Sequence, residues 1–140
     1  MDFQPRTSAE VRRRLSRAEY PNDIVEAVVA DLERAGLLDD AKFSADWVES
    51  RSRKKGLGSR RLAAELRQKG IGQEQTAQAL EGLDSDQEIA NALDLARKRT
   101  KPGDAVDPAA KRRLTAYLQR RGYGWDVIEK VFKEIEVQDE

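Results

Sequence analysis

The sequence predicts an all-α protein, made of tandem three-helix repeats stacked into an elongated, curved helical array. Three observations support this fold class: net charge alternates with a period near fifty residues, an internal repeat appears at an offset of 52 residues, and apolar residues recur at helical spacing. Of the 140 residues, 39% are hydrophobic and 37% are charged. A single thick core is therefore not expected.

The charge of the whole chain is zero because large blocks cancel. In chain order the net charge is +3 over residues 1–17, −7 over 18–50, +7 over 51–70, −6 over 71–95, +7 over 96–125 and −4 over 126–140. An exposed helix usually mixes its charges over three or four residues. The longer alternation therefore indicates a repeated unit with basic and acidic helices.

The repeat is clearest where residues 60–72 are placed over residues 112–124, since seven of the thirteen positions are identical. Both segments have the pattern of a short helix, a glycine turn and a second short helix. A weaker first copy has apolar residues in comparable places, namely Leu15, Tyr20, Ile24, Val28 and Leu32.

Three units of about fifty residues follow from this repeat. The expected units are residues 1–57 with a basic, an acidic and a Phe/Trp helix, residues 58–107 with the second triplet and a connecting loop, and residues 108–140 with a third, incomplete triplet. Triplets of short helices cannot bury their apolar stripes alone, so stacking must supply the core.

Local signals place the helices of the first unit. Thr7 and Glu10 predict a capping box ahead of the first helix, and the second helix is expected to begin near Asn22. The third should start at Asp39 or Asp40, because a carboxylate there accepts free amides.

The third helix is expected to place Phe43 and Trp47 on its apolar face and to end at Gly56. We expect its residues Phe43, Trp47 and Arg51 to correspond to Ile89, Leu93 and Arg97 in the next unit.

The second unit has similar signals for the starts and ends of helices. Ser59 is expected to cap the fourth helix, and Gly70 separates the fourth helix from the fifth. Ser85 and Glu88 predict a capping box for the sixth.

The seventh helix should begin at Asp107 and Pro108, after a connecting loop over residues 100–107. The eighth is expected from Trp125 to about Glu136, and no segment alternates long enough to predict a strand.

Composition excludes several classes of function. The chain has no Cys and no His, so thiolate and imidazole catalysis, disulfides and Cys/His zinc sites are excluded, and we expect no cofactor, no metal site, no catalytic residue and no enzyme. No stretch approaches the roughly 18 apolar residues of a membrane span, and the N-terminus is unlike a signal peptide. We therefore expect a soluble, cytoplasmic protein, and a monomer.

Residues 36–44 read Gly-Leu-Leu-Asp-Asp-Ala-Lys-Phe-Ser and form the most specific motif of the chain. This motif resembles the signature Gly-x-Leu-(Asp/Asn)-Asp-x-(Arg/Lys)-Phe-(Ala/Ser) of the RecX family, the bacterial regulators of the RecA recombinase. The resemblance continues over residues 51–58, Arg61, residues 65–71, Gly122, Tyr123, Ile128 and Val131. Two features depart from it: family members usually carry more sequence before Arg6, and Glu19 stands where the first repeat often has Gly.

The resemblance implies a regulator that lies in the groove of the RecA–DNA filament and restrains its recombinase, ATPase and coprotease activities in DNA repair, recombination and the SOS response. Its implied partners are the RecA filament and single-stranded DNA within it. A repeating charged array also suits such a target physically, because several weak contacts add through effective concentration.

Basic residues are the candidate binding residues, since concentrated positive charge favours a partner over a merely solvated surface. The partner would be DNA phosphate, the acidic groove of a protein filament, or both. The candidates are Arg51, Arg53, Lys54, Lys55, Arg60, Arg61, Lys69, Arg97, Lys98, Arg99, Arg112, Arg113, Arg120 and Arg121.

Other interpretations stay open at this point. For the protein as a whole, two alternatives to the regulator remain. One is an independent, non-sequence-specific DNA-binding protein, and the other is a helical scaffold. The turn at residues 56–59 would either bind phosphate or only stop and start helices. Asp39 and Asp40 would cap a helix or bind Mg²⁺, and Trp47 and Trp125 would belong to the core or stack on bases.

Overall fold

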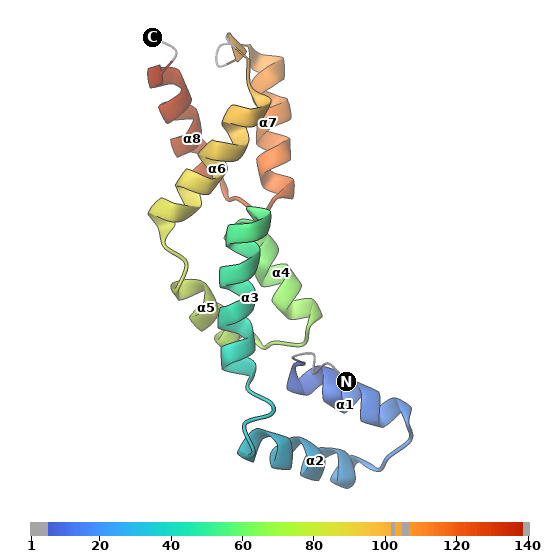
Figure 1. The fold of residues 1–140 in the computed structure, drawn as a ribbon. Helices are drawn as coiled ribbons and strands as arrows, with labels where there is room; N and C mark the ends of the chain where they lie inside the picture. Colours follow the sequence, from blue (N-terminus) through green and yellow to red (C-terminus); the bar gives the residue numbers. More distant parts are fainter. Residues whose placement is uncertain (1–5, 102, 105–106, 139–140) are drawn as a thin grey trace.

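The computed structural model describes residues 6–101, 103–104 and 107–138, and within these residues the regular structure is α-helical (Figure 1). In chain order the helices are α1 (Ser8–Arg17), α2 (Asn22–Arg34), α3 (Asp40–Lys55), α4 (Ser59–Gln68), α5 (Gln73–Glu81), α6 (Ser85–Arg99), α7 (Pro108–Arg120) and α8 (Trp125–Gln138). The expected all-α repeat fold is confirmed. Three residues of the expected connecting loop lie outside the described residues, namely Pro102, Ala105 and Val106.

The helices follow one another in three groups along an elongated molecule, with α1 and α2 at one end and α6, α7 and α8 at the other (Figure 1). One core joins α3, α4 and α5 around Leu62 and Leu66, which are fully buried. A second joins α6, α7 and α8 around Leu118 and Ile128. Short helices thus bury their apolar stripes against neighbours, as the repeat requires.

The packed groups are offset from the units expected from the sequence. The boundaries after residues 57 and 107 fall inside the α3–α5 and α6–α8 groups, at their α3/α4 and α6/α7 connections. A repeat of fixed period does not define where a unit begins, so the sequence alone is consistent with either division.

Most helix boundaries follow the expected caps. Thr7 and Glu10 form the capping box of α1, and the Asp39 side chain accepts the amide of Lys42 at the start of α3. Gly56 ends α3 in the left-handed conformation, which glycine adopts without strain. Asp107 caps α7 ahead of Pro108.

Two expected caps are wrong. The N-cap of α4 is Gly58, without a side-chain bond, and Ser59 is the first helical residue. The N-cap of α6 is Asp84 rather than Ser85. At α4 a contact with distant residues, described below, replaces the local cap, whereas at α6 the Asp84 side chain accepts the amide of Asp86 and is a local cap.

None of the helices described by the structure is both long and apolar enough to cross a membrane.

Candidate binding surface

A joint forms where the turn between α7 and α8 lies on the start of α4. The amide of Gly58 donates to the carbonyl of Arg121 at 2.8 Å, and the amide of Arg60 donates to that of Gly122 at 3.0 Å. These are the amides that a phosphate at the helix start would need. Because they are bonded to protein, the turn at residues 56–59 serves to join helices and the phosphate interpretation of it is not supported.

Carboxylates from the following helical group, α3–α5 or α6–α8, bond to the starts of α1 and α4. Ser59 donates its amide to Glu88 Oε1 at 2.9 Å. In the same way Ser8 donates its amide to Asp40 Oδ1 at 2.9 Å and its hydroxyl to Oδ2 at 2.5 Å. A carboxylate is favourable at the positive end of a helix dipole. Asp39 and Asp40 therefore cap α3 and α1, in agreement with the helix-capping interpretation.

The matching contacts of Asp40 and Glu88 show that α3 and α6 superpose at an offset of 48 residues. At that offset the buried Val48 falls on the buried Ala96. Arg51 then corresponds to Arg99. The pairing of Arg51 with Arg97 expected from the sequence is therefore wrong.

Arg51 is part of a partly buried network between α3 and α4. Its Nε donates to Glu65 Oε1 at 3.0 Å and its Nη2 to Oε2 at 2.5 Å, and Trp47 Nε1 also donates to Oε1 at 3.0 Å. The hydrogen bonds from Arg51, against the opposing effect of burial, lower the pKa of Glu65. Arg51 is thus already neutralised within the protein.

Lys69 and Arg121, 52 residues apart in sequence, hold the two joints. The Lys69 carbonyl accepts from the Thr7 hydroxyl at 2.6 Å, and its ammonium lies 3.7 Å from Glu10. Arg121 donates to the carbonyl of Lys55. These two candidate residues, like Arg51, stabilise the array.

The other eleven candidates are exposed. Three of them lie near carboxylates of their own helices, Arg53 with Glu49 at 3.6 Å, Arg61 with Glu65 at 3.6 Å and Lys98 with Asp94 at 3.4 Å. The pairs of Arg53 and Lys98 are exposed on both sides, and such pairs contribute only about 0 to 1 kcal/mol. Arg61 is exposed, and its partner Glu65 already accepts two hydrogen bonds from Arg51. These side chains remain free to bind a partner.

Three of the exposed candidates meet in one groove, which we call the arginine notch. It is lined by Arg99 from the end of α6 and by Arg113, Tyr117 and Arg120 from α7, and its volume is about 410 Å³. The guanidinium carbon of Arg99 lies 3.8 Å from the centroid of the Tyr117 ring. Arg113, Tyr117 and Arg120 share a face of α7 because they are spaced by four and three residues.

Arg112 lies outside the notch, in a neighbouring groove of about 540 Å³ that Trp125 and Phe132 also line. Trp125 is 55% exposed, so its assignment to the core is wrong. Trp47, by contrast, packs against the α3–α5 core, stacked on Phe43 with ring centroids 5.6 Å apart. The core interpretation is correct for Trp47 alone.

Sequence reasoning missed Glu65 and Tyr117 as partners of Arg51 and Arg99. Glu65 and Tyr117 are 52 residues apart and therefore occupy equivalent positions of the repeat. They differ, although seven of the thirteen aligned positions around them are identical. That difference was visible in the sequence. Its consequence depends on which arginine packs against Glu65 and which against Tyr117, and only the folded protein shows this.

Comparison with known proteins relates this geometry to one family. Models of the first, second and third three-helix domains of RecX match residues 1–32, 39–80 and 86–132. Among curated relatives, the regulatory protein RecX of Mycobacterium ulcerans is 42% identical over 124 residues, which cover 87% of this chain and 72% of the relative. That of Thermobifida fusca is 38% identical over 131 residues, covering 93% and 71%.

Solved structures show the same fold. A crystal structure of RecX from Lactobacillus salivarius superposes with a TM-score of 0.88 at 20% identity and covers 96% of this chain and 88% of that one. A second, titled as a regulatory protein RecX, gives 0.78 at 25% identity, with 92% and 64% covered. The relatives are named as regulatory proteins and not as enzymes.

Proposed function

This chain belongs to the RecX family of regulatory proteins, and we propose that it regulates the RecA recombinase by binding along the groove of the RecA–DNA filament and inhibiting recombinase, ATPase and coprotease activities. It would act in DNA repair, recombination and the SOS response, as a cytoplasmic monomer without catalytic activity of its own. The observation that carries the proposal is the ordered match of three RecX domains across residues 1–132.

The arrangement of exposed charge supports binding at several points. Arg60 and Arg61 on α4 are exposed beside the buried Leu62, and Arg112 and Arg113 on α7 are exposed beside the buried Leu114. Equivalent pairs thus recur on successive helical groups of an elongated molecule. Each exposed ion pair is worth about 0 to 1 kcal/mol, so affinity for a periodic target would come from adding several.

Two other functions remain as alternatives. The arginine notch favours direct DNA binding, which a DNA-binding protein would use without RecA. A plain helical scaffold would instead use the basic residues only as solvated surface. The three functions differ in what neutralising the arginine pairs does to RecA inhibition and to binding of free DNA.

The test follows RecA ATPase activity and filament length on single-stranded DNA as variants are added. The variants are Arg60→Gln with Arg61→Gln, Arg112→Gln with Arg113→Gln, and all four together. Glutamine is chosen because a glutamate at position 61 would lie beside Glu65. Each pair should raise the concentration needed for inhibition by about tenfold, and the quadruple variant by more, because separate contacts of one multivalent interface are lost.

A matched control removes the same charge elsewhere. Arg13 and Arg17 are exposed on α1 and are not candidate binding residues, so Arg13→Gln with Arg17→Gln should inhibit RecA as the wild type does. If the quadruple variant is folded and inhibits like the wild type, these arginines are only solvated surface. If RecA inhibition and affinity for free DNA fall in parallel in every variant, the DNA-binding alternative is correct.

A further inference from the structure

Arg51 and Arg99 are equivalent residues of successive groups, but they pack against different side chains. Arg51 is neutralised by Glu65, whose side chain is only 10% exposed. Arg99 occupies the same place one group later, but there the facing residue is Tyr117, whose ring packs against the guanidinium without cancelling its charge. Arg99 therefore occupies the place of Arg51 in the next group but has no carboxylate in the place of Glu65.

Further positive charge is added at the same place. Arg113 and Arg120 line the notch beside Arg99, and among the described residues lining it the one carboxylate is that of Asp104, which already accepts the amide of Lys101 at 2.8 Å. Three guanidinium groups and one carboxylate line the groove, so it carries an excess of positive charge, and like charges in one place repel one another. Such a cluster is favourable when an anion neutralises it.

The shape of the notch indicates which anion. A volume of about 410 Å³ is within the range of small-ligand sites. The guanidinium carbon of Arg99 lies over the Tyr117 ring, 3.8 Å from its centroid, and Arg99 is exposed. A flat, exposed guanidinium is a surface on which a base stacks. An acidic peptide would use the charge of the notch but not this flat surface.

We propose that the arginine notch binds one nucleotide of single-stranded DNA, with the base stacked on the exposed face of Arg99 and the adjoining phosphates bonded to Arg113 and Arg120. This inference deepens the proposed function, and rests on it for the choice of DNA as the nucleic acid. It assigns direct contact with the DNA strand to the α6–α7 end of the array. Arg60 and Arg61, which lie at the joint with α7 and α8, then belong to a separate contact.

The phosphate part is tested with a fluorescently labelled oligothymidylate and no RecA. Arg113→Gln with Arg120→Gln should bind about tenfold more weakly. Its log–log slope of affinity against salt concentration should be shallower by about 1.4, the value for two lost contacts to single-stranded DNA. The control variant Arg13→Gln with Arg17→Gln removes the same charge from α1 and should keep the wild-type slope.

The base part is tested by changing the probe. The wild type should prefer the oligothymidylate over an abasic oligonucleotide of equal length by about tenfold, the effect of one stacked base. Arg99→Gln and Tyr117→Leu should each abolish this preference. Leucine retains apolar packing of the half-buried Tyr117 side chain, and circular dichroism verifies that both variants are folded.

Three outcomes would overturn the inference: no preference of the wild type for the oligothymidylate, an unchanged salt slope in Arg113→Gln with Arg120→Gln, or equal competition by polyglutamate of the same charge, which would assign the notch to an acidic protein. The proposed function is tested separately by RecA inhibition. A protein that binds the oligothymidylate as expected but never inhibits RecA would retain the notch site and lose the proposed function.

Discussion

The Glu65 network allows a sharp test of what holds α3 and α4 together. Replacing Glu65 by Gln keeps the size of the side chain but removes the charge that Arg51 and Trp47 bond to. Glu65 is 10% exposed and Arg51 is 31% exposed, so the pair is mostly removed from solvent. The substitution therefore leaves Arg51 partly buried without its counter-ion.

The expected loss is about 2 to 3 kcal/mol of unfolding free energy. Hydrogen bonds to charged groups contribute roughly 1.5 to 3 kcal/mol each, and Glu65 accepts two from Arg51. Gln still accepts one bond, and the partial exposure of Arg51 lets water replace part of the rest. The loss therefore falls below the roughly 3 to 5 kcal/mol found when fully buried pairs are broken.

The effect also depends on pH. The pKa of Glu65 is lowered in the folded protein, chiefly by its hydrogen bonds from Arg51. A carboxyl with a lowered pKa stabilises the fold above its unfolded pKa, about 4.3 for Glu, and loses that contribution as pH falls toward the lowered value. The difference between wild type and Glu65→Gln should be constant from neutral pH down to about pH 5 and shrink in more acidic solution.

The assay is urea unfolding followed by the fluorescence of Trp47, in a Trp125→Phe background so that one tryptophan reports. The matched control is Glu49→Gln on α3, whose side chain is 69% exposed and lies 3.6 Å from Arg53. It should change the unfolding free energy by less than about 0.5 kcal/mol. If Glu65→Gln is as stable as this control at neutral pH, the network does not stabilise the α3–α4 packing.

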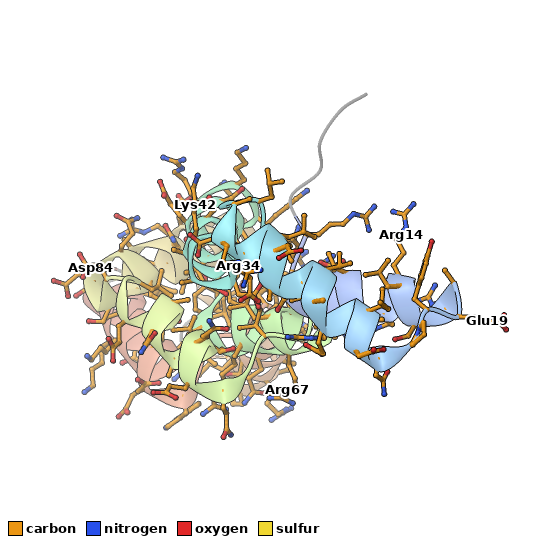
Figure 2. The ribbon with its side chains drawn as sticks, turned by 90° about the horizontal axis from the view of Figure 1, so that it is seen from below. Arg14, Glu19, Arg34, Lys42, Arg67 and Asp84 are labelled. Atoms are coloured by element: carbon orange, nitrogen blue, oxygen red, sulfur yellow. The ribbon has the colours of Figure 1, made fainter. Side chains whose placement is uncertain are left out.

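Two glycine substitutions test the joints and the turns. A Cβ at Gly122 would lie 2.3 Å from Arg61 Cβ, whereas a Cβ at Gly103, also at positive φ, meets nothing within 4 Å. Gly122→Ala should therefore lower the unfolding free energy in urea by about 3 kcal/mol or more and increase the radius of gyration. Gly103→Ala should lower the unfolding free energy by only about 1 kcal/mol. Equal losses would show that backbone conformation, and not the joint, is responsible. Glu19 has φ 68° at the far end of the α1–α2 pair (Figure 2), so Glu19→Gly should stabilise by about 1 kcal/mol and raise the midpoint of thermal unfolding; a lowered midpoint would contradict this.

The sequence predicted the features that depend on neighbouring residues. Gly56, Asp107 and Pro108 end or begin helices through their own backbone and side-chain chemistry, so the end of α3 and the start of α7 are as expected. The cap of α4 could not be predicted in this way. Its first amides bond to Glu88 and to the turn between α7 and α8, which are distant in sequence.

The predicted correspondence between residues of α3 and α6 is wrong for a related reason. The prediction aligned large apolar residues and chose Ile89 and Leu93. In the structure these are only partly buried, whereas Ala92 and Ala96 are fully buried in the α6–α8 core. Small residues that let helices approach closely give no strong hydrophobic signal in a sequence.

The candidate site shows the same division between local and tertiary information. Repetition predicted where basic residues recur, but it did not separate those that stabilise the array from those free to bind. In the structure, Arg51 and Arg99 hold equivalent places, and the residue across the helix interface, Glu65 or Tyr117, determines whether the charge is neutralised. Arg51 and Arg99 occur in helical groups of the same fold, so one position of a repeat can determine whether an arginine is neutralised without a change of fold.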